Sequence, residues 1–430
     1  MTEQMAVNNN VILIVGTTAD YIDWIRKISP DRCLFLTDAS VRRNATEPNP
    51  KKREEILCDL NDYRMSGVKL SDYLRRWDLK LDGITCFDCE SMELAAVLAR
   101  QYSLTYPSCE SIGFCRDKYV SKTRWKEKGL KCPRIKKICS LLEATDFFME
   151  IKGPMILKPR TGSGSELVFL CKSPAEAKSN YESICRALEN QPANRLYRTV
   201  CPANELIVAE EFIAGEEYSC DFLIDHKQAH LLRLTKKIPA LNRPCGTIHG
   251  YLLIDSLPGS LHKDDLLKTL YQSAESLQIS YGICMMDFIV KNHDIYLLET
   301  APRPGGDCIP HLLRKVRGWD ILEFSLDVAR GKYSLPSSED NNTRPGFMGF
   351  RILGKKEGII KKIETSAAEK DGRILEITLS RRPGHLIKMP PDDYSSWILG
   401  HVIARIDPDI GPEEQLREMH EEINIVMDKN

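Results

Sequence analysis

The strongest constraint on the fold is a change in how the apolar segments are connected along the chain. The apolar runs 11–15 and 83–87 are each followed by a segment with helical spacing of apolar residues. This order is typical of parallel strands whose two faces are both buried. Later apolar runs, within 155–171 and 282–300, are joined by short polar or glycine-containing turns, which predicts antiparallel pairs. The sequence therefore predicts an α/β fold with an N-terminal parallel lobe, a central hairpin lobe and further lobes of antiparallel sheet.

With 430 residues, the chain is too long for one ordinary core. A basic helix is expected from about residue 116 to Gly129, followed by Pro133, and 205–224 is expected to form two strands around a glycine turn. The predicted units are an N-terminal domain at 1–112, a central domain at 113–333, a polar linker at 334–346 and a small C-terminal lobe at 347–430. The central domain is divided into a lid part at about 135–214 and a catalytic part at about 215–333.

Composition excludes several classes of protein. Lysine and arginine total 60 against 61 acidic residues, so no overall positive field favours nucleic acid. The 15 cysteines are scattered, which favours reduced thiols and a cytoplasmic location, and no apolar run is long enough to predict a signal peptide or a membrane-spanning helix. Cys86 and Cys89 have CxxC spacing but lack a second pair, so packing at a strand end is the favoured interpretation.

A lysine and a small-residue loop predict a phosphate site. Lys158 ends an apolar strand, and TGSGS follows at 161–165 with backbone amides that bulky side chains do not obstruct. A second strand follows the loop where a helix would be expected in a P-loop, so a hairpin lid over phosphates is the predicted geometry. An ordinary flexible hairpin is the alternative, and Lys118 taken alone is expected to lie on a solvated helix face.

Acidic residues at strand ends predict contacts to donors and to a cation. Glu210 and Glu217 are placed to accept hydrogen bonds from an adenine amino group and from ribose, although a solvated acidic turn remains the alternative. Asp287 and Glu299 lie on adjacent predicted strands, and two facing carboxylates predict a Mg²⁺ site. Arg303 stands between two prolines and is followed by Gly305 and Gly306, which favours binding of an anion beside the metal.

The order of these motifs resembles the ATP-grasp superfamily, and especially its carboxylate–amine ligases of the L-amino acid ligase type. The motifs are DK at 117–118, KP with GSGS at 158–165, EEFIAGEE at 210–217, and D(x11)E(x3)RPGGD at 287–307, and the resemblance spans about residues 10–330. It implies that Arg303 and Lys158 are catalytic, that Asp287 and Glu299 bind Mg²⁺ or alternatively Mn²⁺, and that His249, Arg303, Gly305 and Gly306 contact the substrate. For His249, a structural histidine is the equal alternative. The ATP-binding residues that it implies are Lys118, Lys158, Gly162, Ser163, Gly164, Ser165, Glu210, Glu211, Phe212, Ile213 and Glu217.

One position departs from the family pattern E-x-N-x-R. Ala301 replaces the asparagine, so a second metal would depend on Thr300, Asp307 or water. The expected reaction joins a small-molecule carboxylate and an amine through an acyl phosphate, with no nucleic-acid or membrane partner and with a homodimer as the assembly frequent among such ligases. A carboxylating or purine-pathway ATP-grasp enzyme and a nucleotide-binding regulator without catalysis are the alternatives.

Overall fold

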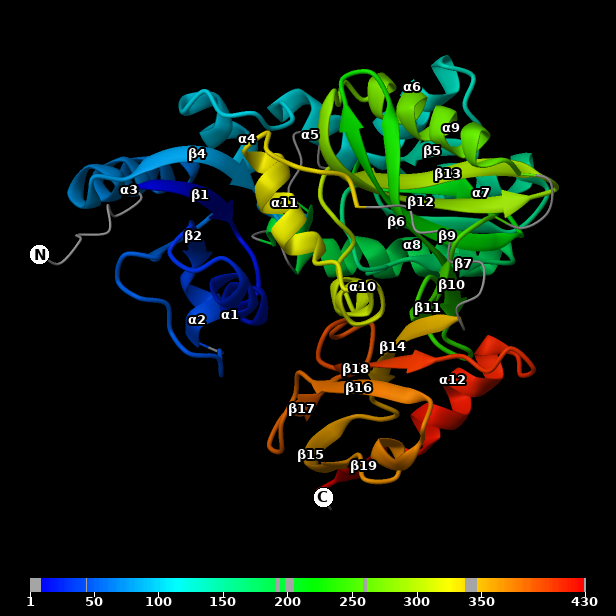
Figure 1. Ribbon diagram of the computed structural model, residues 1–430. Helices are drawn as coiled ribbons and strands as arrows, with labels where there is room; N and C mark the ends of the chain where they lie inside the picture. The colour runs from blue at the N-terminus through cyan, green and yellow to red at the C-terminus, as the bar shows by residue number, and fades with distance from the viewer. Residues whose placement is uncertain are drawn as a thin grey trace, which may run out of the picture.

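A computed structural model describes residues 9–43, 45–190, 194–197, 205–257, 261–336 and 346–428. Four sheets organise this part of the chain, with the N-terminal lobe at one side, the central lobes beside it and the C-terminal strands below (Figure 1). The mixed α/β architecture predicted from the strand connections is confirmed. Residues 337–345 of the predicted linker lie outside the described residues.

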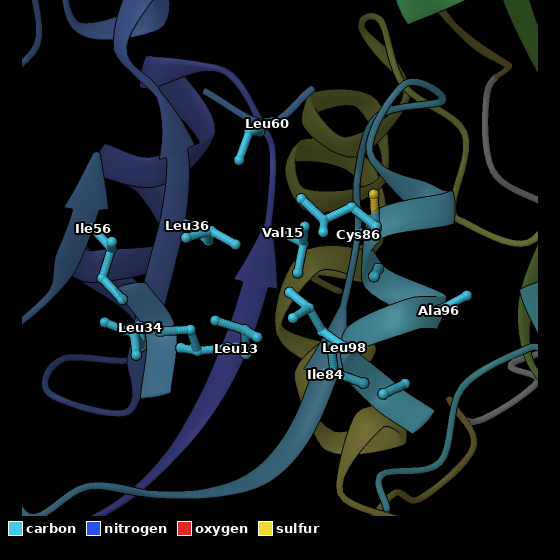
Figure 2. Close-up of a cluster of buried hydrophobic side chains, with 14 of the residues drawn as sticks. Leu13, Val15, Leu34, Leu36, Ile56, Leu60, Ile84, Cys86, Ala96 and Leu98 are labelled. Atoms are coloured by element: carbon cyan, nitrogen blue, oxygen red, sulfur yellow. The ribbon is translucent and has the colours of Figure 1, made fainter. Parts of the chain in front are cut away.

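The N-terminal lobe is a parallel sheet in the order β3-β2-β1-β4. Apolar side chains of β1 and β2 fill both faces, and Figure 2 shows Leu13, Val15, Leu34 and Leu36 meeting Leu98 of α4 in one core. Hydrophobic burial on both faces explains the continuous apolar runs in the sequence. The elements are β1 (Asn10–Val15), α1 (Ala19–Ile28), β2 (Cys33–Asp38), α2 (Ala39–Arg43), β3 (Glu55–Cys58), α3 (Tyr63–Trp77), β4 (Lys80–Thr85) and α4 (Met92–Gln101).

The lid part is an antiparallel sheet in the order β5-β8-β6-β7 with two helices. The predicted hairpin around TGSGS is confirmed, because Met155 of β6 pairs with Cys171 of β7. Ser140 and Ser173 cap the two helices by accepting from the backbone N–H of Glu143 and Glu176. The elements are β5 (Ile135–Ile138), α7 (Leu141–Ile151), β6 (Met155–Pro159), β7 (Phe169–Cys171), α8 (Pro174–Glu189), η1 (Arg195–Tyr197) and β8 (Ile207–Glu211).

The largest sheet has the order β13-β12-β9-β10-β11-β14-β18-β16 and runs across the predicted boundary at the linker. Strands β14, β18 and β16 from the C-terminal region extend the sheet that the catalytic part begins. The elements of the catalytic part are β9 (Glu216–Asp225), β10 (Ala229–Pro239), β11 (Ile248–Ile254), α9 (Lys263–Ser276), β12 (Tyr281–Lys291), β13 (Asp294–Ala301), α10 (Ile309–Arg317) and α11 (Ile321–Ala329).

The C-terminal region also contains a three-stranded sheet in the order β17-β15-β19. A core of apolar residues, which includes Phe350, Trp397 and Met419, packs this sheet and α12 against β14 and β18. The elements are β14 (Phe347–Leu353), β15 (Gly358–Glu364), η3 (Ala368–Lys370), β16 (Ile374–Leu379), β17 (Leu386–Ile387), β18 (Ile398–Arg405), α12 (Pro412–Glu421) and β19 (Asn424–Met427).

The basic helix expected at about 116–129 is α6 (Lys118–Glu127), which Asp117 caps through its side chain, and a separate helix that was not predicted, α5 (Cys109–Arg116), precedes it. The two strands expected within 205–224 are present, but they do not pair with one another, because β8 belongs to the lid sheet and β9 to the largest sheet. Gly215 between them packs closely, since an added Cβ would lie 2.5 Å from the Val290 carbonyl oxygen.

Candidate active site

Two adjoining cavities lie where the lid part meets the largest sheet. The larger has a volume of about 470 Å³ and the smaller about 190 Å³. We call them the nucleotide cavity and the acceptor cavity, after the roles argued below. The residues that line both are Lys118, Gly162, Ser163, Ser165, Lys237, Ile248, Asp287 and Glu299.

A buried carboxylate between two lysines forms one wall of the nucleotide cavity. Glu210 of β8 lies 2.8 Å from the Nζ of Lys158 on β6 and 2.9 Å from the Nζ of Lys122 on α6. Burial opposes ionisation of Glu210, but the two lysines outweigh it and lower its pKa to about 2. The side chain is therefore a carboxylate that orients two cations at the cavity, where phosphate groups could bind.

The small-residue loop closes over the junction of the two cavities. Gly162 and Gly164 have φ of +129° and +69°, a backbone region that glycine adopts without steric cost. Lys118 donates from Nζ to the Gly162 carbonyl oxygen at 2.9 Å, and Ser165 donates from Oγ to the Gly246 carbonyl oxygen at 2.7 Å. The loop is therefore tied both to α6 and to the segment that precedes β11.

Lys118 is buried, contrary to the expectation of a solvated helix face for this residue taken alone. Its side chain is 9% exposed, and its Nζ lies 3.9 Å from Glu299. Burial lowers its pKa to about 8, against the opposing effect of Glu299. The capped start of α6 turns Lys118 inward, and Lys122, one helical turn later, follows the same face.

The segment between β8 and β9 lines the far end of the nucleotide cavity. Glu211, Phe212, Ile213 and Glu217 all contribute to its wall. Ile213 is buried, whereas Phe212 is exposed. Glu217 accepts from the Nζ of Lys237 at 2.6 Å, so its carboxylate is held at the cavity edge.

The two predicted metal ligands face one another across adjacent strands. Asp287 of β12 and Glu299 of β13 are directly paired, as the twelve-residue spacing predicts. Burial raises the pKa of Asp287, and the neighbouring Glu299 adds to this effect. For Glu299, burial is outweighed by Lys118 and Lys158, which lower its pKa.

These carboxylates fit a divalent cation. The Asp287 Oδ1 atom is buried and has no hydrogen-bond partner among the described residues, while Oδ2 accepts from Lys237 at 2.5 Å. A buried carboxylate oxygen without a partner is costly unless a ligand satisfies it. Carboxylate oxygens together with substrate phosphates are the ligands that Mg²⁺ prefers.

Thr300 and Asp307, considered as metal ligands in place of the asparagine that Ala301 replaces, bind other groups. Ala301 is buried in the N-terminal core, and the Thr300 hydroxyl donates to the Met285 carbonyl oxygen at 2.8 Å. Asp307 accepts from Arg351 Nε at 2.6 Å. Within the described residues, Asp287 and Glu299 are therefore the carboxylates that remain for a metal at this position.

Arg303 and the glycine pair lie on the acceptor cavity, as expected. Arg303 donates to the Pro304 carbonyl oxygen at 2.7 Å and to the Cys89 sulfur at 3.1 Å. Its guanidinium is partly buried, which lowers its pKa, but Cys89, Cys86 and Asp88 outweigh this effect and keep the pKa above the usual value. Cys89 thus lies in the acceptor cavity instead of serving only to pack a strand end, while Cys86 is part of the N-terminal core.

A buried ion pair supports the glycine turn. Arg233 and Asp221, on neighbouring strands β10 and β9, are 2.8 Å apart and both side chains are fully buried. Asp221 also accepts from the Gly305 backbone N–H at 2.8 Å. An added Cβ on Gly305 would lie 2.7 Å from the Arg233 guanidinium, so a side chain there would have to displace the buried ion pair.

Three basic residues that line the cavities were missed by sequence reasoning, and His249 has the structural position that was its alternative. Arg116 and Arg351 line the acceptor cavity, and Lys237 lines both cavities. The available signal for Arg116 was its position next to the DK motif, whereas Arg351 lies beyond the linker and carries no local signal. His249 lines neither cavity; its ring packs against Phe350 and His420, and burial lowers its pKa to about 3.

Comparison with known proteins identifies the central region. Residues 115–307 match a family model described as an ATP-grasp domain. Among curated relatives, an L-arginine-specific L-amino acid ligase from Bacillus subtilis is 24% identical, over 69% of each chain. An alanine–anticapsin ligase from Bacillus amyloliquefaciens is 22% identical, over 66% of this chain and 59% of its own length, which is less than two thirds of that relative.

Solved structures agree with this fold. An L-amino acid ligase from Bacillus licheniformis aligns with a TM-score of 0.74 at 16% identity, covering 98% of this chain and 100% of its own. The biotin carboxylase domain of a 2-oxoglutarate carboxylase from Hydrogenobacter thermophilus, in complex with MgADP, aligns with a TM-score of 0.66 at 17% identity, covering 96% and 90%. The fold is therefore the ATP-grasp fold. None of the described helices is long and apolar enough to cross a membrane.

Proposed function

We propose that this chain, whose residues 115–307 match the ATP-grasp domain model, is an ATP-dependent carboxylate–amine ligase that forms an amide or peptide bond through an acyl phosphate. The observation that carries this proposal is the meeting of two cavities at Asp287 and Glu299, under the 162–165 loop. One cavity suits a nucleotide and the other a small anionic substrate. Their junction is where a phosphoryl group would pass from one to the other.

In this proposal, ATP binds in the nucleotide cavity. Lys158 and Lys118 neutralise phosphate oxygens, and Glu210 holds Lys158 in place. The segment from Glu211 to Ile213 and the carboxylate of Glu217 receive the adenosine. The loop of Gly162, Ser163, Gly164 and Ser165 covers the phosphates and keeps water from the transfer.

Asp287 and Glu299 would hold Mg²⁺, with Mn²⁺ as a substitute. Mg²⁺ supplies charge neutralisation for the transferred phosphoryl group when bound. Lys237 ion-pairs with Asp287 and Glu217, which fixes the two carboxylates relative to the nucleotide cavity. The proposal requires one metal and does not depend on a second, because Ala301 cannot ligate.

The acceptor cavity binds the substrate carboxylate. Arg303 faces this carboxylate with its rigid guanidinium, and Gly306 lies on the same cavity wall, whereas the Gly305 N–H is already donated to Asp221. A carboxylate oxygen attacks the γ-phosphorus, ADP leaves, and the acyl phosphate forms. The amine nitrogen then attacks the acyl carbon, phosphate leaves with the C–O electron pair, and the amine proton passes to solvent.

We propose L-amino acids or similarly small carboxylic acids as substrates. The acceptor cavity has a volume of about 190 Å³, which suits a molecule of this size. The names of the two Bacillus relatives point to the same class. The described cysteines are free thiols, which supports a reducing, cytoplasmic location, and a homodimer remains a prediction.

Release of ADP from Mg²⁺-ATP tests this function across a panel of amino acids and small carboxylic acids, singly and in pairs. We expect release that needs a carboxylate and an amine together, with an amide product identified by mass. Glu299→Gln should abolish release, whereas Glu182→Gln, on the exposed face of α8, should not.

Two results would contradict the proposed ligase function. Bicarbonate-dependent release without an amine would favour the carboxylating alternative, which structural neighbours such as the biotin carboxylase domain keep relevant. Tight binding of ATP without ADP release from any substrate pair would favour a nucleotide-binding regulator without catalysis.

A further inference from the structure

A separate group of metal-ligand side chains lies outside both cavities. His311 of α10, Glu376 of β16 and His401 of β18 each offer one ligand atom, and these three atoms lie within 4.8 Å of one another. The Nδ1 of His311 is 3.3 Å from Oε1 of Glu376, and the two imidazole centroids are 4.2 Å apart. None of the three residues lines the nucleotide or the acceptor cavity.

The geometry of this group suits a small cation. Two ligands at about 2.0–2.1 Å from a tetrahedral zinc lie roughly 3.3 Å apart, which is the separation of the His311 and Glu376 atoms. The Nε2 of His401 is buried and has no hydrogen-bond partner among the described residues. Such an atom is costly to bury and points to a missing ligand.

The charges around the group are also compatible with a cation. Each neutral imidazole offers one nitrogen lone pair to a metal and adds no charge of its own. Glu376 supplies one negative charge, and Lys315 lies 3.8 Å from its other oxygen. Lys315 therefore approaches the oxygen of Glu376 that does not face His311, and the oxygen that faces His311 also accepts from the Thr378 hydroxyl at 3.5 Å.

We propose that His311, Glu376 and His401 bind a zinc ion, with water as the fourth ligand. Two imidazoles and one carboxylate favour a borderline metal over Mg²⁺, which prefers oxygen ligands and keeps its waters. This site is chemically distinct from the carboxylates Asp287 and Glu299. It does not depend on the proposed ligase reaction.

The position of the site gives it a structural consequence. Helix α10 follows the turn that ends at Asp307, and it packs against β14 and β18 (Figure 1). His401 is the cross-strand partner of Arg351, and Arg351 pairs with Asp307 at the acceptor cavity. A zinc ion would tie α10 to β16 and β18, and so hold Arg351 against the loop that carries Arg303.

The chain offers matched comparisons for this site. His230 and Asp225 form a histidine–carboxylate pair at 2.9 Å, but no third ligand joins them among the described residues. His249 and His420 form a second buried ring pair, with centroids 4.9 Å apart, and no carboxylate completes it there. We expect neither pair to bind a metal tightly.

Cobalt titration of the full chain tests the proposal. The protein is stripped of metal with a chelator and titrated with Co²⁺ in excess Mg²⁺, which saturates oxygen-ligand sites. We expect visible d–d absorption that saturates at about one Co²⁺ per chain and is abolished by a similar amount of Zn²⁺. Glu376→Gln and His401→Gln should weaken Co²⁺ binding by more than roughly tenfold, since even an indirect partner of a metal ligand contributes that much. His230→Gln should bind as the wild type does.

Two results would overturn the site. One is a wild-type chain without cobalt absorption and without zinc retained by elemental analysis. The other is binding that Glu376→Gln leaves unchanged. If a variant does not fold, thermal unfolding of the wild-type chain tests the site instead. In excess Mg²⁺, added Zn²⁺ must raise the Tm of the wild type, and an unchanged Tm contradicts the proposal.

Discussion

The nucleotide cavity and the acceptor cavity differ in how far along the chain their residues are spread. Apart from Glu413 of α12, the lining of the nucleotide cavity comes from residues between Lys118 and Glu299. The acceptor cavity draws on the N-terminal lobe through Cys89 and on the strand beyond the linker through Arg351. One cavity belongs mainly to one domain, whereas the other is assembled from three regions.

This difference separates the general chemistry from the choice of substrate. In the proposed function, phosphate binding needs lysines, a glycine loop and facing carboxylates, and all of these lie within residues 115–307, which match the ATP-grasp domain model. The charge and shape of the acceptor cavity depend in addition on residues of the N-terminal and C-terminal lobes. The comparison predicts that substitutions in the two cavities affect different kinetic constants.

Loss of the Arg233 guanidinium is expected to have the largest effect, on stability. Arg233→Met leaves Asp221 buried and unpaired beneath the acceptor cavity, which should lower the free energy of unfolding by about 3–5 kcal/mol. Urea denaturation measures this. Lys131→Met breaks an exposed pair with Asp294 and should cost no more than about 1 kcal/mol. Equal costs would contradict the assignment of the Arg233 pair as structural support.

Removal of a phosphate-facing cation is expected to have the next largest effect, on turnover. Lys158→Ala should lower kcat by about 10²- to 10³-fold, because an ammonium that stabilises developing charge is lost. Steady-state ADP release with saturating substrates measures this. Lys178→Ala, on the exposed face of α8, is the control. A change confined to the KM of the carboxylate substrate would show that Lys158 acts in the acceptor cavity and not on the phosphates of ATP.

Substitution of Arg351 should affect the acceptor cavity alone. Arg351→Met removes a guanidinium from this cavity and frees Asp307, so the KM for the carboxylate substrate should rise about 10- to 100-fold. The KM for ATP should stay within about twofold, because Arg351 does not line the nucleotide cavity. Steady-state kinetics of this one variant gives both KM values. A similar rise in both would contradict the conclusion that the two cavities bind different substrates through different residues.

The smallest expected effect is a dependence on pH. Lys118 has a pKa of about 8 in the free protein, below the ordinary value for lysine. It is charged below pH 8 and loses its charge above it, so kcat/KM for ATP should fall by up to tenfold per pH unit above 8. Lys118→Arg should move this decline to higher pH, because guanidinium stays charged. If Lys118→Arg leaves the pH profile of kcat/KM unchanged, a group other than Lys118 causes the decline.

Several features of this protein follow from local sequence. The parallel N-terminal sheet, the hairpin around TGSGS and the pairing of Asp287 with Glu299 were all predicted correctly. The hairpin and the facing carboxylates join residues that are close in the chain, whereas the parallel sheet pairs distant strands, such as Asn10 with Lys80, and was predicted from apolar runs that alternate with helical segments.

Tertiary structure alone decided the rest. The assignment of β8 and β9 to separate sheets, the inward turn of Lys118 and Lys122, and the arrival of Arg351 at the acceptor cavity depend on contacts between distant segments. The grouping of His311, Glu376 and His401 is of the same kind. Local patterns predict which face of an element is buried, but they do not specify which distant element covers it, because that choice depends on packing of the whole chain.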